Sequence, residues 1–488
     1  MQYQYDAKRR VEKVTLNGTE SYLTYAYSED SAGQETVTAT LKDGITETRV
    51  QDVRGNMRSI SRKHGNAQQS VTNTYNEDGQ LTAIADSVSG KTVLEYDGNG
   101  NVTSAAVYRA GNAAVPEATE TYTYDGTGEM PVFKTVTVGN TSHTYRFGYR
   151  TTADKTLASI TIHDGADTGT ATGEGTESNT GYVVEPAFDL LGRYAGRTTR
   201  IGTEVIAKEK ITYLKSGDHA TSLPSTVRFI KSDGTQTTMQ YRYDEMGNIC
   251  EMTENGKLVC RCEYDALGRL TREDHVPFGK TTVWAYDHNG NILMKREYAL
   301  TVAATNQLHM LNSTEKLYDY QDGTDQLLHY GEENFVYDAI GNPTTYRGKQ
   351  AEWHWGRQLT KLGDVSFTYD ARGRRMSKRK DETINFTYDA NGNLIRQSNG
   401  LEFLYDHLGV FAVKYGNSTY FYSKDARQNV VALLDSTGAV VVKYRYDAWG
   451  GCQTTVLHAD ANAIAELNPF RYRSYYFDTE TGLFLVSS

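Results

Sequence analysis

The side chains in this sequence that could carry out chemistry are carboxylates, cysteines and histidines. Two carboxylates that converge on one bond can catalyse its hydrolysis. The Asp residues are instead spaced evenly along the chain, directly after a Tyr and shortly before a Gly, which favours a role in making turns. The eleven His form no His-Glu-x-x-His pattern, and the chain has no Gly-x-Ser-x-Gly sequence. We therefore predict no catalytic residue and no enzymatic activity.

The four cysteines, Cys250, Cys260, Cys262 and Cys452, give no recognised metal-binding pattern. A gap of nine residues followed by Cys-x-Cys matches no common zinc spacing. Cys260 and Cys262 would share one face of a strand, where thiols that pack against their neighbours are the simpler interpretation. The glycine-rich run at 98–101 could suggest a phosphate-binding loop, but it belongs to a repeated turn. We predict neither a metal nor a cofactor.

The turn that the Asp residues make is repeated along the chain. Tyr-Asp occurs twelve times, and in ten copies a Gly lies four places after the Tyr. The Asp can accept a hydrogen bond from the backbone two residues on, and the Gly can supply the positive φ that a short hairpin loop needs. The clearest copies are Tyr96-Asp97 with Gly100, Tyr243-Asp244 with Gly247, Tyr264-Asp265 with Gly268, Tyr286-Asp287 with Gly290, Tyr369-Asp370 with Gly373, and Tyr388-Asp389 with Gly392.

The residues around each copy predict a β-hairpin. Nine of the twelve Tyr carry another aromatic residue two places earlier, as in Tyr241 and Tyr243. A period of two places both rings on one face of a strand. Clean copies follow one another at about twenty residues, and a fixed period of this size indicates a repeat array in which each unit contacts mainly its neighbours.

Composition limits how such an array can fold. The chain has 36 Tyr, only 7 Pro, and 38% apolar residues, so we expect most strands to bury one face only. A sheet of far more than about ten strands has to curl or close. We therefore predict an all-β fold: a long, curled antiparallel sheet that forms a spiral, cocoon-like shell, either closed or open. A solid sandwich is the alternative.

Other features bound the location and the partners. A net charge of −10 argues against nucleic acid as the main partner, and no apolar run is long enough to span a membrane. The chain begins within a repeat and has no signal peptide, so we expect it to be part of a longer protein. We expect a mobile loop over 164–181, an irregular crossing loop over 301–325, and a short helix from Ala459 to Leu467 capped by Asp460. After this helix we expect a strand at 468–473 and a last hairpin at 475–483.

The repeated Tyr-Asp-x-x-Gly unit resembles the YD repeat of the RHS (rearrangement hotspot) family. The C-terminal stretch resembles the start of that family's associated core segment, which would divide the chain into a repeat shell at 1–445 and a truncated core segment at 446–488. The residues that carry this second resemblance are Tyr446, Asp447, Gly450, Asn468, Pro469, Arg471, Tyr472, Glu480, Thr481 and Gly482.

The resemblance implies a function for the shell. In bacterial relatives it encloses a C-terminal toxin, which implies a non-enzymatic encapsulating scaffold in a secreted or injected protein, with its own C-terminal cargo as partner. The later Asp-Pro-x-Gly elements, from which some relatives build an autoprotease, are absent from this sequence, so no catalytic residue carries over. The alternative is a cell-surface or wall-associated protein that acts in adhesion or binds a surface glycan.

Overall fold

The computed structural model describes residues 1–16, 20–112, 114–150, 156–165, 181–217, 219–300 and 314–486, which form two compact units of antiparallel β-strands. Unit 1 comprises Met1–His143, Tyr320–Leu328 and Glu332–Asn399, and unit 2 comprises Thr144–Asp319, His329–Gly331 and Gly400–Ser488. The long antiparallel sheets confirm the predicted all-β class. The predicted division at residue 446 stays a prediction.

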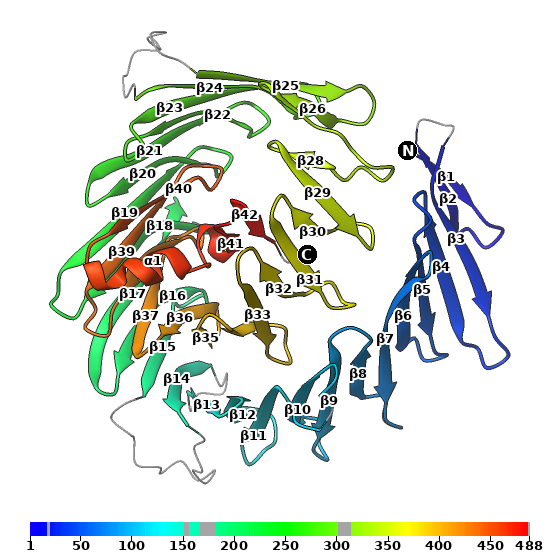
Figure 1. Cartoon of the computed structure of the whole chain (residues 1–488). Coiled ribbons are helices and arrows are strands. Elements are labelled where there is room, and N and C mark those ends of the chain that lie inside the picture. The colour runs from blue at the N-terminus through cyan, green and yellow to red at the C-terminus, as the bar shows by residue number, and fades with distance from the viewer. Residues whose placement is uncertain are drawn as a thin grey trace. The chain divides into compact units, whose positions relative to one another are not determined.

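Unit 1 contains two ladders in which each strand pairs with the next one along the chain. Figure 1 shows the early strands of the first ladder side by side in chain order. The first ladder consists of β1 (Gln2–Tyr5), β2 (Val11–Leu16), β3 (Glu20–Glu29), β4 (Glu35–Leu41), β5 (Thr46–Gln51), β6 (Met57–His64), β7 (Ala67–Tyr75), β8 (Leu81–Asp86), β9 (Gly90–Tyr96), β10 (Val102–Arg109), β11 (Ala118–Tyr124) and β12 (Pro131–Val138). The second consists of β28 (Thr345–Tyr346), β29 (Lys349–His354), β30 (Gln358–Leu362), β31 (Val365–Tyr369), β32 (Arg375–Arg379), β33 (Thr383–Tyr388) and β34 (Leu394–Gln397).

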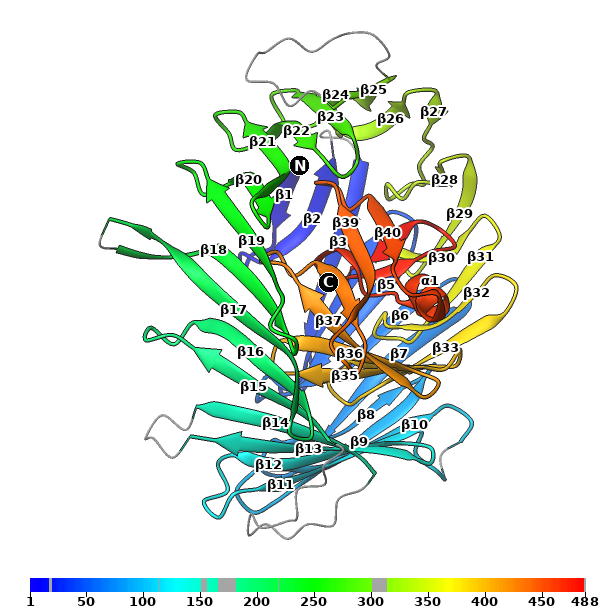
Figure 2. The same cartoon turned by 90° about the vertical axis from the view of Figure 1, so that its left-hand side faces the viewer.

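Unit 2 repeats this arrangement, and Figure 2 shows β15 to β19 side by side in chain order. Its first ladder consists of β14 (Leu157–Asp164), β15 (Tyr182–Phe188), β16 (Tyr194–Ile201), β17 (Glu204–Ser216), β18 (His219–Lys231), β19 (Gln236–Tyr243), β20 (Ile249–Glu254), β21 (Lys257–Tyr264), β22 (Leu270–His275), β23 (Lys280–Tyr286), β24 (Ile292–Ala299) and β25 (Thr314–Gln321). Its later strands are β35 (Leu401–Asp406), β36 (Gly409–Tyr415), β37 (Ser418–Lys424), β38 (Val430–Leu434), β39 (Val440–Tyr446), β40 (Cys452–Val456), β41 (Tyr476–Asp478) and β42 (Leu483–Leu485). Along the chain, β13 (Thr141–Tyr149), β25 and β26 (Gln326–Tyr330) span the limits of the two units, and β27 (Glu333–Asn334) follows β26.

Two predicted loops have different outcomes. The loop expected over 164–181 lies almost wholly outside the described residues. An irregular loop is expected over 301–325, and residues 301–313 of it lie outside the described residues. For the rest the prediction is wrong, because Thr314–Gln321 forms β25. Tyr318 and Tyr320 alternate along this strand, which pairs with β24. The alternation of these two tyrosines is too short to indicate a strand in a sequence otherwise rich in Thr, Asn and Gln.

The repeated turns have the geometry that the sequence predicts. All ten Gly residues of the Tyr-Asp-x-x-Gly copies have a φ between +72° and +108°. In the copy at Tyr264, the Oδ1 atom of Asp265 accepts the backbone N–H groups of Leu267 at 2.9 Å and Arg269 at 3.0 Å. The N–H of Gly268 also bonds to the carbonyl of Asp265 at 2.9 Å. The result is a type I turn closed by a glycine bulge.

The repeat tyrosines bond each hairpin to the one before it. The hydroxyl of Tyr264 donates to the carbonyl of Ile249 at 3.0 Å. Ile249 is the first residue of β20 and pairs with Tyr243, so the bond reaches the preceding copy. We call this contact the tyrosine staple, and it recurs at Tyr96, Tyr124, Tyr243, Tyr286, Tyr337, Tyr369, Tyr388 and Tyr446.

Arg269 adds a further link between two successive copies of the repeat. Arg269 donates through Nε to Asp265 at 2.6 Å and through a terminal nitrogen to the carbonyl of Asp287 at 2.7 Å. Its guanidinium also lies 4.9 Å from the ring centroid of Tyr286, within cation–π range. One side chain therefore links the turns of two successive copies.

In each unit, strands from later in the chain contact those of the first ladder. In unit 1, the backbone N–H of Ala371 donates to Asp86 at 2.9 Å. In unit 2, the ring of Phe421 on β37 lies 5.7 Å from that of Tyr182 on β15, and six of the seven residues of β37 are buried. A period of two identifies which residues share a face, but not which two faces meet, so this layering could not be predicted.

The C-terminal region begins with the predicted helix. A 3-10 helix (Ala459–Ala461) leads into α1 (Asn462–Leu467), but the predicted cap is wrong, because Asp460 lies inside the 3-10 turn and neither helix has a side-chain cap. The strand expected at 468–473 is also wrong. Tyr472–Ser474 forms a second 3-10 turn, in which Arg473 and Ser474 have positive φ. The final hairpin, β41 and β42, forms as expected.

Removing one staple hydroxyl should destabilise unit 2. We expect Tyr264→Phe to lower the free energy of unfolding by about 0.5–1.5 kcal/mol, because the ring remains but the bond to Ile249 is lost. Chemical denaturation followed by circular dichroism measures this change. Tyr5→Phe is the control, since the side chain of Tyr5 is 59% exposed. Equal effects of the two substitutions would contradict the staple.

The turn carboxylates should make the fold sensitive to acid. The backbone N–H of Arg269, followed by its guanidinium, lowers the pKa of Asp265 below the ordinary 3.8. A lowered pKa in the folded state gives stability that is present above the unfolded pKa and is lost as the pH falls through the folded value. We expect Asp265→Asn, which keeps the Oδ1 acceptor, to flatten the loss of stability below about pH 4. Denaturation curves measured across that range test this, and an unchanged acid profile would contradict it.

Candidate functional site

The residues predicted as the core-segment signature meet in unit 2, and a buried amide lies at their centre. Asn468 is fully buried. Its Oδ1 atom accepts the hydroxyl of Tyr422 at 2.8 Å. Its Nδ2 atom donates to the carbonyl of Phe470 at 3.0 Å and to the hydroxyl of Tyr444 at 3.3 Å. The amide thus has a partner for its acceptor and for both donors, as a buried polar group requires.

Arg471 is a buried cation held by backbone carbonyls. It is 7% exposed, and its Nε atom donates to the carbonyl of Asn468 at 3.1 Å. A terminal nitrogen donates to the carbonyls of Ala465 at 3.3 Å and Glu466 at 3.2 Å. These carbonyls belong to the last turn of α1, where helices leave acceptors without intrahelical partners. Arg471 therefore fixes the end of the helix to the segment that follows it.

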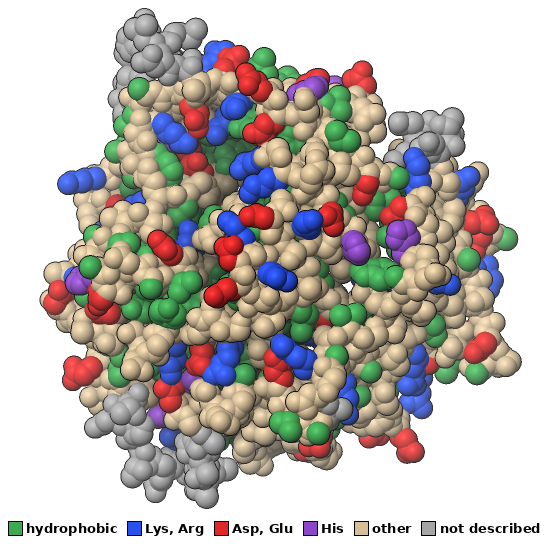
Figure 3. Space-filling model, in the orientation of Figure 1, with side chains coloured by type: hydrophobic (Ala, Val, Ile, Leu, Met, Phe, Trp, Pro, Cys, Tyr) green, Lys and Arg blue, Asp and Glu red, His purple; other side chains and the backbone are tan. Residues whose placement is uncertain are grey.

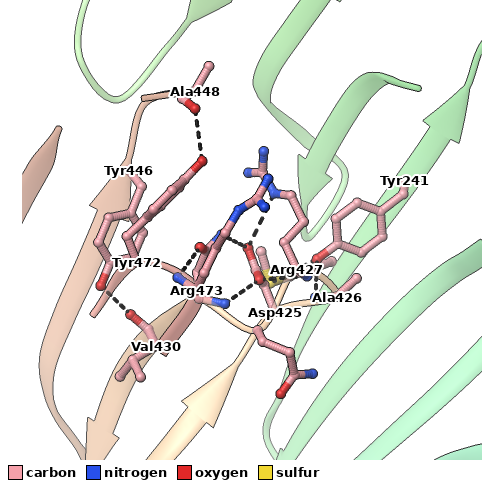
Figure 4. A network of polar contacts seen from close by, with 12 residues as sticks. Tyr241, Asp425, Ala426, Arg427, Val430, Tyr446, Ala448, Tyr472 and Arg473 are labelled. Carbon is pink, nitrogen blue, oxygen red and sulfur yellow. Dashed lines mark hydrogen bonds and ion pairs between the residues drawn. The ribbon is translucent and has the colours of Figure 1, made fainter. Parts of the chain in front are cut away.

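The last Tyr-Asp copy interlocks with this segment (Figure 4). The hydroxyl of Tyr472 donates to the carbonyl of Ala448 at 2.9 Å, and that of Tyr446 donates to Val430 at 2.7 Å. A Cβ atom added to Gly450 would lie 3.1 Å from the ring of Tyr472. Glycine at this position is needed both for its φ of +85° and for the close approach of the ring.

The other signature residues shape the chain around this contact. Asp447 closes its own turn by accepting the backbone N–H of Gly451 at 2.7 Å. The carbonyl of Pro469 accepts the N–H of Phe477 at 2.8 Å. Thr481 and Gly482 form the turn between β41 and β42, in which Gly482 has a φ of +73°. Glu480 lies in the same turn. The six repeat signatures, in contrast, lie in separate turns and do not form one site.

Sequence reasoning missed one turn that belongs to this region. Asp425 accepts the backbone N–H groups of Arg427 and Asn429, both at 2.9 Å, as a repeat Asp does. Asn429 is fully buried and accepts the N–H of Arg473 at 2.9 Å. The hydroxyl of Tyr241 accepts the N–H of Ala426 at 3.2 Å (Figure 4). The motif was hidden because Lys replaces Tyr and Gln, with a φ of +63°, replaces Gly. Asn four residues after Asp was the remaining signal.

A second group of buried charges joins the two layers of unit 2. Arg197 on β16 forms an ion pair with Asp406 on β35, and its Nε atom lies 3.8 Å from a carboxylate oxygen of Glu209. Burial raises the pKa of Glu209 and lowers that of Lys424 to about 8. Perturbed pKa values also occur in structural ion-pair networks, and these charges are arranged as such a network.

A cavity of about 470 Å³ lies between the two layers of unit 2. It is lined by apolar side chains of β18, β19, β38 and β39, including Phe229, Met239 and Val440. Lys443 and Arg445 lie at this cavity and pair with Glu254. Its volume is within the range of small-molecule pockets, about 300–1,000 Å³.

Comparison with known families identifies the fold. A family model described as the Teneurin YD-shell matches residues 176–488, which is more than half of the chain. The chain belongs to the Teneurin YD-shell family. A second model, the RHS repeat, matches residues 75–113, so the resemblance found in the sequence is confirmed. The match to the YD-shell includes both the dense Tyr-Asp copies and the core-segment signature.

This YD-shell chain is also similar to curated bacterial proteins. It is 28% identical over 245 residues to the tRNA nuclease WapA of Bacillus subtilis strain 168, a match that covers 46% of this chain and 10% of that protein. It is 31% identical over 183 residues to the tRNA(Glu)-specific nuclease WapA of Bacillus subtilis subsp. natto strain BEST195, covering 33% of this chain and 7% of that protein. The chain thus spans a tenth or less of the length of these relatives.

Solved structures share the YD-shell fold over almost the whole chain. The crystal structure of TcdB2-TccC3-Cdc42 matches with a TM-score of 0.70 and 16% identity, covering 99% of this chain and 28% of that chain. The Photorhabdus luminescens Tc holotoxin pore matches with a TM-score of 0.63 and 13% identity, covering 99% and 27%. At these identities the likeness shows the fold alone, and it supports the predicted shell-type β-sheet.

The surface adds two observations. On the face shown in Figure 3, Lys and Arg side chains are interspersed with Asp and Glu. Within the described ranges, no helix is both long and apolar enough to cross a bilayer. The expectation that nucleic acid is not a partner stays a prediction.

Truncating the buried amide should loosen the core segment. We expect Asn468→Ala to lower the free energy of unfolding by about 1–3 kcal/mol, because the buried hydroxyl of Tyr422 loses its acceptor. Chemical denaturation measures the effect. Asn462→Ala, at an exposed position of α1, is the control and should change stability by less than about 0.5 kcal/mol. If Asn468→Ala also changed the free energy of unfolding by less than about 0.5 kcal/mol, the amide would not hold the segment.

Proposed function

We propose that this chain is part of an encapsulating β-shell in a toxin-type protein, where it encloses a C-terminal effector domain. The observation that carries this proposal is the likeness over 99% of the chain to structures of TcdB2-TccC3, one of which lacks a hypervariable C-terminal region. In the WapA nucleases, the matched segment is at most a tenth of the protein. Their activity can therefore reside elsewhere, with this segment as a scaffold.

The construction of the wall suits such a role. Tyrosine staples, and arginine side chains such as Arg269, join successive hairpins. The sheet therefore does not depend on a thick apolar core. The buried polar groups of the core segment bond to one another and to backbone carbonyls, as Asn468 and Arg471 do. Such bonds hold parts of the fold together, and we assign no reaction step to these residues. We infer secretion or injection from the same family relationship.

The core segment also supplies a fixed attachment point for cargo. Asn468 and Arg471 hold α1 and the following residues against β37 and β39. A polypeptide that followed β42 would therefore start from a hairpin that packs on this anchored segment, since the ring of Phe484 lies 6.0 Å from that of Tyr472. A domain attached in this way would not need an affinity of its own for the wall in order to stay close to it.

Limited proteolysis of the full-length natural protein tests this proposal. We expect peptides from the region that follows this chain to be released at least about tenfold more slowly than from the same region expressed alone, because proteolysis requires the substrate to be accessible or open. Asn468→Ala should speed their release by loosening the core segment, and Asn462→Ala should not. Quantitative mass spectrometry of the released peptides provides the measurement.

Equal digestion of the following region with and without the shell would contradict the proposal. If tight and selective binding on a glycan array accompanied that result, the two together would favour a surface protein that binds carbohydrate.

A further inference from the structure

Two thiols and a carboxylate meet on one face of unit 2. The Sγ atoms of Cys260 and Cys262 and a carboxylate oxygen of Glu273 all lie within 4.8 Å of one another. Cys262 pairs with Glu273 across β21 and β22, and Cys260 is two residues earlier on the same strand. Because side chains alternate between faces, strand pairing itself brings the three groups together.

We propose that Cys260, Cys262 and Glu273 form a binding site for a zinc ion. Thiolate sulfur and carboxylate oxygen are both ordinary ligands of Zn²⁺, at about 2.3 Å and about 2.0–2.2 Å. Donor atoms within 4.8 Å of one another can converge on one ion at these distances through small side-chain rotations. Three protein ligands leave the fourth tetrahedral position to water.

Positive charge lies beside the site. Two thiolates and a carboxylate around a divalent cation leave one negative charge. Arg427, on the turn after β37, interacts electrostatically with all three groups and also pairs with Asp425, and Lys280 acts on Glu273. Cys260 and Glu273 are 3% and 4% exposed. A buried charge is retained in a fold when it is paired, and here the metal and the guanidinium provide the pairing.

The carboxylate also connects the site to the core segment. The Oε2 atom of Glu273 accepts the backbone N–H of Ala448 at 3.2 Å, which leaves the other oxygen for the metal. His275 pairs with Cys260, and its Nε2 atom lies 2.9 Å from the carbonyl of Tyr446. A metal bound here would therefore link β21 and β22 to the turn at 446–450. The inference does not depend on the proposed function.

The spacing of the cysteines in the sequence concealed this arrangement. Zinc patterns read along a sequence assume that the ligands lie in knuckles or on one helix. Here Glu273 is supplied by the neighbouring strand, and its place beside Cys262 follows from a register that only the structure shows. Cys250 and Cys452 are outside the cluster. The inference replaces the interpretation of Cys260 and Cys262 as packing thiols.

Zinc titration of the whole chain, after treatment with a chelator, tests the site. We expect one equivalent of Zn²⁺ to bind, and Co²⁺ in its place to show thiolate charge-transfer absorption. Cys260→Ser and Cys262→Ser should each weaken binding by at least about 100-fold and Glu273→Gln by at least about tenfold, given that even residues outside the ligand sphere cost 10–100-fold. Cys250→Ser and Cys452→Ser are matched controls and should bind zinc as the unaltered chain does.

A second measurement on the unaltered chain removes the dependence on folded variants. Zinc should protect the partly exposed Cys262 from alkylation, as followed by mass spectrometry, and should leave the rates at Cys250 and Cys452, which are also partly exposed, unchanged. Equal protection of these three thiols, or protection of none of them, would overturn the proposal. So would zinc binding that survives Cys260→Ser and Cys262→Ser, or a chain that binds no zinc.

Discussion

The bond from a tyrosine hydroxyl to a carbonyl of the preceding hairpin is the constraint on which both units depend. The turn residues define each hairpin locally, since Asp265 and Gly268 act within five residues of the chain. The staple adds a contact between successive hairpins. It also gives the partly buried tyrosine hydroxyl a hydrogen-bond acceptor. Each such bond contributes about 0.5–1.5 kcal/mol, and its repetition along the ladders makes a modest interaction decisive.

The local part of this design could be read from the sequence, and the rest could not. Tyr-Asp-x-x-Gly predicts a turn because both the acceptor at Asp265 and the positive φ at Gly268 are properties of neighbouring residues. The acceptor of the staple, Ile249, is set by the registers of β19 with β20 and of β20 with β21, which spacing alone does not give. The contact between Asp86 and Ala371 joins residues far apart in the chain, so no local sequence pattern predicts it.

The candidate site shows the same limit. The resemblance to the RHS core segment pointed to Asn468 and Arg471, but only the structure shows that one is a buried amide and the other a cation on helix carbonyls. The helix was predictable from its Ala content, whereas the role of Asp460 was not, because the chain enters α1 through a 3-10 turn. Glu273 escaped notice because its neighbours Cys260 and Cys262 are close only across a strand pair.

The staple ends on a backbone carbonyl, which every residue type possesses. Most of the accepting residues are apolar, such as Leu81 and Pro224, but Arg375 accepts in the same way, so the bond itself requires no particular side chain. The bond therefore restricts the residue type at the donor position of a copy, where a tyrosine hydroxyl is needed, and does not itself restrict it at the acceptor position. An in-frame duplication or deletion of one whole hairpin keeps a carbonyl at each new junction, so a gene of this kind can change its number of copies without having to evolve new partner residues.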